Sequence, residues 1–486
     1  MIPKLTYNTL ILAMLACCYA IQGHAQATNS RSKSQKAVDV SCGAIVSHCS
    51  NSAMKAYRSY GLGQFIHWGI YSLPGNEWKG HRYNGASERI RTWNDASAPN
   101  HWTMTYDNLY KQFDPLNFDA GQWAKQAKKM GARYMIFTAK NQDGFALWPT
   151  KFSAYQVMNT PFNRDIVGEI VNAYTAEGID VFLSFSIRDW RNPNYMTKKP
   201  VTAAEKTKFN HFLAFTKNQI LELLDSYPKI KGVWFDGTDD ESWMLAYQYF
   251  YQLEKDIRLK YPQIIIGLVF ENDKYRNQYT DVQASLMGDY VQRWERRLPY
   301  DINCVKGKDW EALISITPQD LGYVRNWSGK YIKTTNDIIR LLMRTVAMNG
   351  NFVLNFGPDG TGEMHPEEDK IAAELAGWMT INREAVYGTK HAADFGMNEY
   401  GYFTQKEKDL YLTIFNRPVD NIVRISTPRI HKNILLSAQL LSDSTPLKLK
   451  QVDMGVALDK NMYYDILLPV QQESIRPFVI KIKLEN

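Results

Sequence analysis

The alternation of short strand-like runs with helical patterns constrains this chain more than any other sequence feature. The expected strands span residues 64–69, 134–140, 179–186, 232–236, 263–270, 313–316 and 352–356. The expected helices span residues 117–130, 166–177, 206–224, 243–259 and 337–348. Strands joined by helices in this way run parallel, because each helix carries the chain back to the start of the next strand.

The first long helix shows the pattern clearly. Trp123, Ala127 and Met130 follow one another at intervals of four and three residues, so they share one helical face. Asp119 stands at its start and Gly131 at its end, as is typical of helix boundaries. About eight strands between residues 53 and 388 predict a (β/α)₈ barrel with insertions. A doubly wound open sheet is the alternative, but no Gly-rich phosphate loop supports a nucleotide site.

The pattern changes after residue 388. Apolar residues now alternate with polar or smaller ones, at Leu410, Leu412 and Ile414 and again at Ile480, Ile482 and Leu484. Half-buried strands without intervening helices are typical of antiparallel sheets. We therefore expect an α/β protein, with the TIM-like barrel at 53–388 followed by a C-terminal antiparallel β-sandwich at 389–486 that serves packing or glycan contact.

Residues 1–27 have the character of a secretory signal peptide. An apolar stretch at 10–18 follows Lys4, and Ala25-Gln-Ala27 offers a cleavage site. The stretch is shorter than the roughly 20 residues that a membrane-spanning helix needs, and no later segment is long and apolar enough. We expect a secreted or periplasmic protein without a membrane span. Lipid attachment at Cys17 is the alternative.

The remaining bulk features narrow the function classes. Residues 28–52, rich in Ser, Asn and Gln, are typical of a linker, and Cys42 and Cys49 are close enough for a local disulfide. The net charge of +7 includes no Lys/Arg run that would favour a nucleic-acid partner. Nothing in the sequence indicates a metal or an organic cofactor. Thirteen Trp and 29 Tyr fit a core and a sugar-binding pocket equally well.

Functional groups of a parallel barrel project from the carboxyl ends of its strands. His67, Lys140, Asp189 and Asp236 all stand at such places in the sequence. Asp236 follows Trp234 and Phe235 directly, so its carboxylate is poorly solvated and held rigidly, as a nucleophile should be. The alternative is an ordinary helix cap, a role that the aspartates following Gly237 could also fill.

Several motifs, in one order along residues 55–390, resemble the α-L-fucosidases of glycoside hydrolase family 29. They are Phe65-Ile-His-Trp-Gly69, Glu77-Trp78, Phe118-Asp-Ala-Gly-Gln-Trp123, Asp143-Gly-Phe-Ala-Leu-Trp148, Trp234-Phe-Asp236 and Asn349-Gly-Asn-Phe-Val-Leu-Asn-Phe-Gly-Pro-Asp-Gly360. The resemblance implies a retaining glycosidase with Asp236 as its nucleophile. Its acid/base is expected at Glu295, since Gly288-Asp-Tyr290 and Glu295-Arg-Arg-Leu-Pro299 resemble the segment that carries that group. Glu311 is the rival.

The resemblance also implies a sugar pocket. His67, Glu77 and Trp78 correspond to residues that hold sugar hydroxyls, and Trp234 would present an aromatic wall to the fucose methyl group. One departure stands out, because the usual Lys-His-His-Asp-Gly is replaced by Lys140-Asn-Gln-Asp-Gly144. Asn141 and Gln142 can donate and accept hydrogen bonds, but they do not titrate near neutral pH.

The expected function is therefore a retaining exo-α-L-fucosidase acting on glycans or oligosaccharides with two carboxylates and no cofactor. A glycosidase for a related sugar, such as an α-L-galactoside or a decorated fucose, is one alternative, because the amide pair changes the groups that read the ring hydroxyls. A non-catalytic carbohydrate-binding protein is the other.

Overall fold

The computed structural model describes residues 52–237, 240–244, 247–268, 288–307, 309–317, 320–328, 331–395, 398–431, 434–455, 459–470 and 476–485. The expected signal peptide, the expected linker up to residue 51 and the Cys42–Cys49 pair lie outside these residues. Cys304 is a free, exposed thiol. Within the described part of the chain, no helix is both long and apolar enough to cross a membrane.

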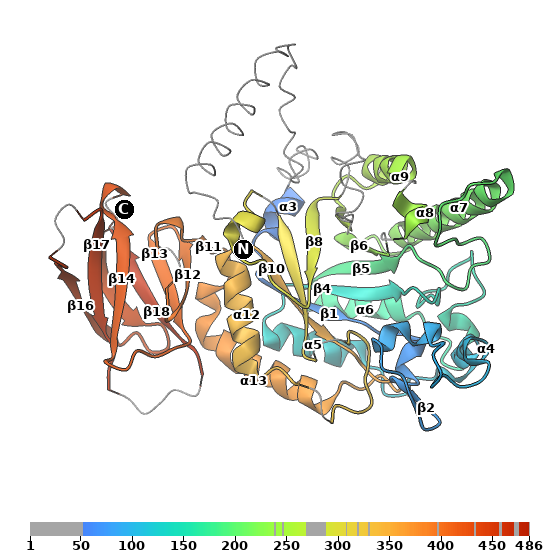
Figure 1. Ribbon diagram of the computed structural model, residues 1–486, viewed down its shortest axis with the longest axis horizontal. Helices are drawn as coiled ribbons and strands as arrows, with labels where there is room; N and C mark the ends of the chain where they lie inside the picture. Colours follow the sequence, from blue (N-terminus) through green and yellow to red (C-terminus); the bar gives the residue numbers. More distant parts are fainter. Residues whose placement is uncertain are drawn as a thin grey trace, which may run out of the picture. The chain divides into compact units, whose positions relative to one another are not determined.

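Eight parallel strands close into a barrel (Figure 1). In chain order they are β1 (Leu62–Ile66), β4 (Tyr134–Lys140), β5 (Asp180–Ser186), β6 (Gly232–Asp236), β7 (Ile265–Leu268), β8 (Tyr290–Glu295), β9 (Trp310–Ser315) and β10 (Asn351–Phe356). The first strand pairs with both β4 and β10, which closes the sheet. The predicted barrel is confirmed, and the open-sheet alternative is wrong.

Helices cover the outside of the barrel. They are α5 (Ala120–Met130), α6 (Ile166–Ala176), α7 (Ala203–Ser226), α8 (Glu241–Met244), α9 (Tyr247–Lys260), α12 (Thr335–Ala347) and α13 (Pro366–Asn382). Helix α5 begins where the sequence predicts, because Asp119 accepts a 2.9 Å hydrogen bond from the Gln122 amide. It ends at Gly131, whose φ of 94° suits glycine. The helix expected at 243–259 corresponds to α8 and α9, and residues 245–246 between them lie outside the described part of the chain.

Strand β8, the sixth barrel strand along the chain, is the one that the sequence pattern missed. The apolar residues of β8 are Tyr290, Val291 and Trp294, and polar residues separate Trp294 from the other two, so the strand has no long apolar run. Its pairing with β9 is also shifted between Val291 and Trp294, an irregularity that disturbs the alternation of a regular strand. Glu295 is the last residue of this strand, so it lies at the carboxyl end of the barrel.

The barrel interior has its own packed core, separate from the layer between strands and helices. Phe65, Tyr134, Phe182, Trp234 and Tyr290 are among the buried residues that fill it. The short helix α3 (Ser52–Tyr57) adds Met54 and Tyr57 from the side where the strands begin. The interior is therefore filled with side chains at the amino ends of the strands, and the chemistry is confined to the carboxyl ends.

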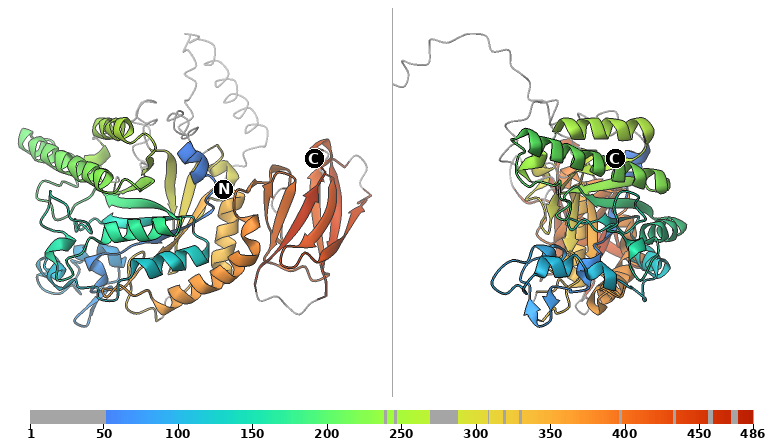
Figure 2. Two further views of the ribbon diagram at one scale, coloured as in Figure 1. Left: turned by 180° about the vertical axis from the view of Figure 1, so that it is seen from behind. Right: turned by 90° about the vertical axis from the view of Figure 1, so that its right-hand side faces the viewer.

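The C-terminal region is one curled antiparallel sheet (Figure 2). Its order is β11 (Lys390–His391), β12 (Gly401–Lys406), β13 (Asp409–Ile414), β18 (Phe478–Leu484), β15 (Leu435–Leu440), β16 (Pro446–Val452), β17 (Asn461–Leu467) and β14 (Ile422–Pro428). Side chains from both ends of this sheet share one core, which includes all six residues of the predicted alternation. The indole of Trp378 on α13 donates to the Pro477 carbonyl at 2.8 Å, so this sheet contacts the barrel.

Candidate active site

An insertion between β1 and α5 supplies side chains to the carboxyl ends of the strands. It contains the hairpin β2 (Glu77–Trp78) and β3 (His81–Arg82), a 3₁₀ turn at Ser87–Thr92 and helix α4 (Trp102–Tyr106). Its Glu88 meets loops that follow the strands, as described below. This insertion forms part of the rim of the candidate site.

Asp236 is the last residue of β6 and belongs to the interior face of the strand. Val233 and Phe235 pack in the outer core, whereas Trp234 packs in the barrel interior. Because side chains alternate along a strand, Asp236 shares the inner face with Trp234. Gln142 Nε2 donates to Asp236 Oδ2 at 2.9 Å. The carboxylate therefore lies over the barrel interior at its carboxyl end.

The chain turns sharply after Asp236. Gly237 has a φ of 87°, and a Cβ atom there would lie 2.7 Å from Arg188 Cγ. Asp240 forms an ion pair with Arg188, with 2.9 Å between Oδ2 and Nε, and it accepts a hydrogen bond from the Tyr195 hydroxyl. Asp239 lies outside the described residues. Asp236 therefore lies at the carboxyl end of the barrel, whereas Asp240 is held in an ion pair with Arg188.

Glu295 ends β8, and its side chain is 34% exposed. Arg296, whose φ is 59°, follows it directly. The Arg296 guanidinium lies 3.8 Å from Glu295 Oε2 through Nη1 and 3.3 Å from Glu88 Oε1 through Nη2. Strands β6, β7 and β8 are neighbours and run parallel, so Asp236 and Glu295 lie at the same end of the barrel, with one strand between them.

The rival carboxyl, Glu311, has different surroundings. It is the second residue of β9, near the amino end of that strand, and is 1% exposed. Its oxygens accept hydrogen bonds from Trp234 Nε1 at 2.7 Å, from the Tyr134 hydroxyl at 3.0 Å and from the Tyr57 hydroxyl at 3.4 Å. Burial raises the pKa of Glu311 to about 7. The structure therefore places Glu311 inside the barrel core.

His67 follows β1 and is 7% exposed. Its Nδ1 lies 2.5 Å from Asn355 Oδ1, and Asn355 Nδ2 donates to the Leu321 carbonyl at 2.7 Å. Because the second bond fixes the Asn355 amide, Oδ1 is the acceptor, and we assign the proton of His67 to Nδ1. Burial, with a smaller contribution from nearby Arg296, lowers the pKa of His67 to about 3. His67 is thus neutral and presents Nε2 as an acceptor.

The two amides that follow β4 have separate partners. Asn141 Nδ2 donates to the Glu88 carbonyl at 3.2 Å, whereas Gln142 bonds to Asp236. Lys140 points into the buried layer outside the barrel, where its Nζ lies 3.6 Å from Asp189 Oδ2 and 3.1 Å from Gln219 Oε1. Of the polar residues after β4, Gln142 is the one in contact with Asp236.

Of the remaining predicted pocket residues, one is buried and two are half-buried. Trp234 is 2% exposed, and its ring centroid lies 5.3 Å from that of Phe65 in the barrel interior. Glu77 and Trp78 are half-buried in the β2–β3 hairpin, where the Trp78 ring packs against Trp102 at 5.8 Å. Their contacts with a sugar stay predictions.

Glu88 is a residue of the candidate site that the sequence did not predict. It accepts hydrogen bonds from the backbone amides of Leu321 and Gly322, both at 3.2 Å, and contacts Arg296. Burial raises its pKa. Glu88 thus links the insertion to the loops after β8 and β9. Its sequence context, Ser87-Glu-Arg-Ile-Arg91, is that of an ordinary solvated helix, so no local signal could have identified it.

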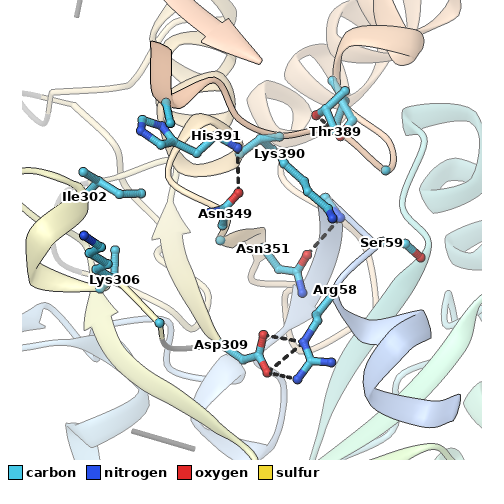
Figure 3. Close-up of a pocket in the computed structure, with 18 of the residues that line it drawn as sticks. Arg58, Ser59, Ile302, Lys306, Asp309, Asn349, Asn351, Thr389, Lys390 and His391 are labelled. Carbon is cyan, nitrogen blue, oxygen red and sulfur yellow. Dashed lines mark hydrogen bonds and ion pairs between the residues drawn. The ribbon is translucent and has the colours of Figure 1, made fainter. Parts of the chain in front are cut away.

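A separate cavity of about 620 Å³ lies at the amino ends of the strands (Figure 3). Arg58 and Asp309 face each other on its wall in a bidentate ion pair, with a shortest N–O distance of 2.6 Å. Asn349 Oδ1 accepts the backbone amide of His391 at 2.7 Å. This cavity is at the opposite end of the barrel from Asp236, and the described residues that line it include no facing pair of carboxyls.

Comparison with known proteins identifies the family. The sequence pattern of the family described as Alpha-L-fucosidase matches residues 28–384. The chain belongs to this family. It is 27% identical to the tissue α-L-fucosidase of Rattus norvegicus over 377 residues, which cover 76% of this chain and 78% of the rat protein. The family expected from the motifs is confirmed, and with it the class of glycoside hydrolases.

Solved structures extend the similarity to the whole architecture. The crystal structure of a family GH29 α-L-fucosidase from Bacteroides thetaiotaomicron has a TM-score of 0.82 and 36% identity, covering 90% of this chain and 95% of that one. A second structure from that organism, with equal TM-score and identity, is described as a trapped covalent intermediate with 2-fluoro-fucosyl fluoride in a glutamate-to-glutamine mutant; it covers 90% of this chain and 97% of that one.

Proposed function

We propose that this protein is a retaining exo-α-L-fucosidase that removes terminal α-L-fucose from glycans or oligosaccharides. Asp236 attacks the anomeric carbon as the bond to the leaving oxygen breaks, and Glu295 gives its proton to that oxygen. Glu295 then takes a proton from water, whose oxygen attacks the same carbon and releases Asp236 as a carboxylate. Two displacements at one carbon retain its configuration.

The placement of Asp236 and Glu295 carries this proposal. Both residues end barrel strands on one side, with β7 between them. Neighbouring strands lie roughly 4.8 Å apart, so β6 and β8 are separated by roughly 10 Å. Side chains that reach toward each other across β7 would shorten that gap toward the roughly 5–5.5 Å typical of retaining enzymes. Glu311, near the amino end of β9, has no comparable access.

The surroundings of the two carboxyls suit different roles. Asp236 is bonded by a neutral amide, so no cation cancels its charge at that contact. Glu295 has a side chain that is 34% exposed and lies beside Arg296. In the first step the charge of Asp236 favours the proton-bearing form of Glu295, which can donate. Formation of the glycosyl ester removes that charge and lets Glu295 act as a base in the second step.

The proposal is tested with aryl α-L-fucoside and aryl α-L-galactoside. The parent protein should hydrolyse the fucoside, Asp236→Ala should be inactive, and Glu311→Gln should retain substantial activity as a matched carboxyl control. Failure of the parent to hydrolyse either substrate would overturn the proposal. Full activity in Asp236→Ala would remove the nucleophile.

A related sugar is a second candidate, because of the amide at Gln142. An active site built around one set of hydroxyls discriminates strongly when a hydrogen-bonding partner changes. The enzyme would then prefer an α-L-galactoside or a decorated fucose while using the same two carboxylates. Hydrolysis of the galactoside without hydrolysis of the fucoside would replace the leading proposal with this one.

We also propose that the protein is exported to the periplasm or beyond the cell. The support is the sequence of residues 1–27, with an apolar stretch and a small-residue cleavage site. N-terminal sequencing of protein from the expressing cell tests this. A mature terminus near residue 26 or 28 is expected, and a terminus at a lipid-modified Cys17 would favour the anchored alternative.

A further inference from the structure

Gln142 has two polar atoms with different surroundings. Its Nε2 donates to Asp236 Oδ2 at 2.9 Å. Among the described residues its Oε1 is buried and has no hydrogen-bond partner. The two ends of the amide cannot be exchanged, because the reverse orientation would face an oxygen acceptor against a carboxylate oxygen. The amide is thus fixed with its donor on Asp236 and its acceptor left over.

The segment around Gln142 is held from several directions. The Gln142 carbonyl accepts the Trp190 amide at 2.9 Å, and the Asn141 carbonyl accepts the Gly144 amide at 3.0 Å. Asp143 accepts a hydrogen bond from the Tyr106 hydroxyl at 2.6 Å. With Asn141 bonded to Glu88, this part of the chain is tied to three neighbouring elements. Such support gives the Gln142 side chain a defined position.

From this geometry we propose that Gln142 is a neutral positioning residue for the nucleophile and reads one sugar hydroxyl through Oε1. The inference rests on the proposed glycosidase function. The bond to Oδ2 orients the carboxylate and leaves Oδ1 to attack the anomeric carbon. A buried acceptor without a partner is costly, and a ring hydroxyl is a donor of suitable size and chemistry.

The other charges of this region have partners of their own. Lys140 pairs with Asp189, Arg188 pairs with Asp240, and Asp143 accepts from Tyr106. Across the site, Arg296 lies between Glu295 and Glu88. A charge introduced at position 142 therefore faces the Asp236 carboxylate first.

The decisive variant is Gln142→Glu. It keeps an oxygen at the position of Oε1 but sets two carboxylates about 3 Å apart, and such a pair holds one proton more tightly than a single carboxylate does. The acidic limb of the pH profile of kcat/KM should move upward by about one pH unit or more. Gln142→Met, which removes both polar atoms, should lower kcat/KM by about 10- to 100-fold.

A conservative variant separates positioning from a merely structural role. Gln142→His offers one ring nitrogen as donor and the other as acceptor, so it should restore kcat/KM to within about fivefold of the parent and add an ionisation. A structural role alone would not produce both the rescue and the shifted limb.

The chain offers a matched control at Gln126. Its Nε2 donates to Asp369 Oδ1 at 2.6 Å, between α5 and α13 and on the outside of the barrel. Gln126→Glu creates the same like-charge pair there and should leave the pH profile unchanged. A Gln142→Glu profile that matches the parent would overturn the positioning role, with the parent still active. A parent that hydrolyses neither aryl glycoside would remove the proposed function and this inference together.

Discussion

Two buried or half-buried carboxyl groups in one barrel, Asp236 and Glu311, differ in what surrounds them. Glu311 accepts hydrogen bonds from an indole and two tyrosine hydroxyls and is closed from solvent. Asp236 ends its strand and is bonded by one neutral amide of a neighbouring loop. A carboxyl whose oxygens are satisfied inside a core serves structure, whereas one with an oxygen left over at the carboxyl end of a barrel is suited to attack.

Replacing the nucleophile should have the largest effect. Asp236→Ala should lower kcat by roughly four orders of magnitude or more, because no other group forms the glycosyl-enzyme. Since Asp236 lies at the edge of the interior, the thermal unfolding midpoint should change little. Steady-state kinetics and differential scanning calorimetry on the same preparation check both parts. A large fall in the unfolding midpoint would make Asp236 resemble Glu311 and break the comparison.

Removal of the acid/base should have the next largest effect. Glu295→Ala should slow aryl fucosides with poor leaving groups by roughly 10²- to 10⁴-fold and those with good leaving groups less. Azide should partly restore the rate, because it needs no general base to attack the glycosyl-enzyme. The readout is kcat/KM against leaving-group acidity. If Glu311→Ala behaves in this way and Glu295→Ala does not, the two carboxyls have been assigned the wrong roles.

Glu311 should instead control stability as a function of pH. Its pKa is about 7 in the folded protein, against 4.5 as its ordinary value. A raised folded pKa stabilises the fold fully below about pH 4.5, and this contribution is lost as the pH rises through about 7. Relative to the parent, Glu311→Gln should therefore gain up to about 3 kcal/mol between pH 5 and pH 8. Denaturant unfolding at both pH values measures this, and a constant difference would contradict it.

The smallest effect should come from Trp234→Phe. This change keeps an aromatic ring against Phe65 but removes the hydrogen bond to Glu311. We expect a loss of about 1–2 kcal/mol in the free energy of unfolding. Because Trp234 lies close to Asp236 on β6, kcat/KM should also fall, but by less than in Glu295→Ala. Chemical denaturation measures the loss of stability, and steady-state kinetics of both variants compares the two losses of kcat/KM. A larger loss of kcat/KM in Trp234→Phe than in Glu295→Ala would indicate that Trp234 mainly contacts the sugar.

The sequence predicts best where one local pattern determines the outcome. Strands β4 and β6 have the predicted bounds of residues 134–140 and 232–236, because their apolar runs are continuous and flanked by clear breaks. The position of Asp236 was predicted for the same reason, since the end of such a run marks the carboxyl end of a barrel strand.

The sequence fails where the outcome depends on distant partners. Strand β8 is irregular, so the strand that carries Glu295 was missed. Lys140 ends a strand as Asp236 does, yet its partners Asp189 and Gln219 draw it to the outside of the barrel. Glu88 becomes part of the candidate site through Arg296, Asn141 and the loop at Leu321. Such contacts join residues far apart in the chain, and no local periodicity encodes them.

The most direct test of the account is to identify the labelled residue. The parent protein is incubated with 2-fluoro-fucosyl fluoride, digested and analysed by mass spectrometry. We predict one fluorofucosyl ester, on Asp236, and none in Asp236→Ala. An ester on Glu295, Glu311 or another carboxylate, or an active parent that gives no ester, would contradict the assignment of Asp236 as the nucleophile.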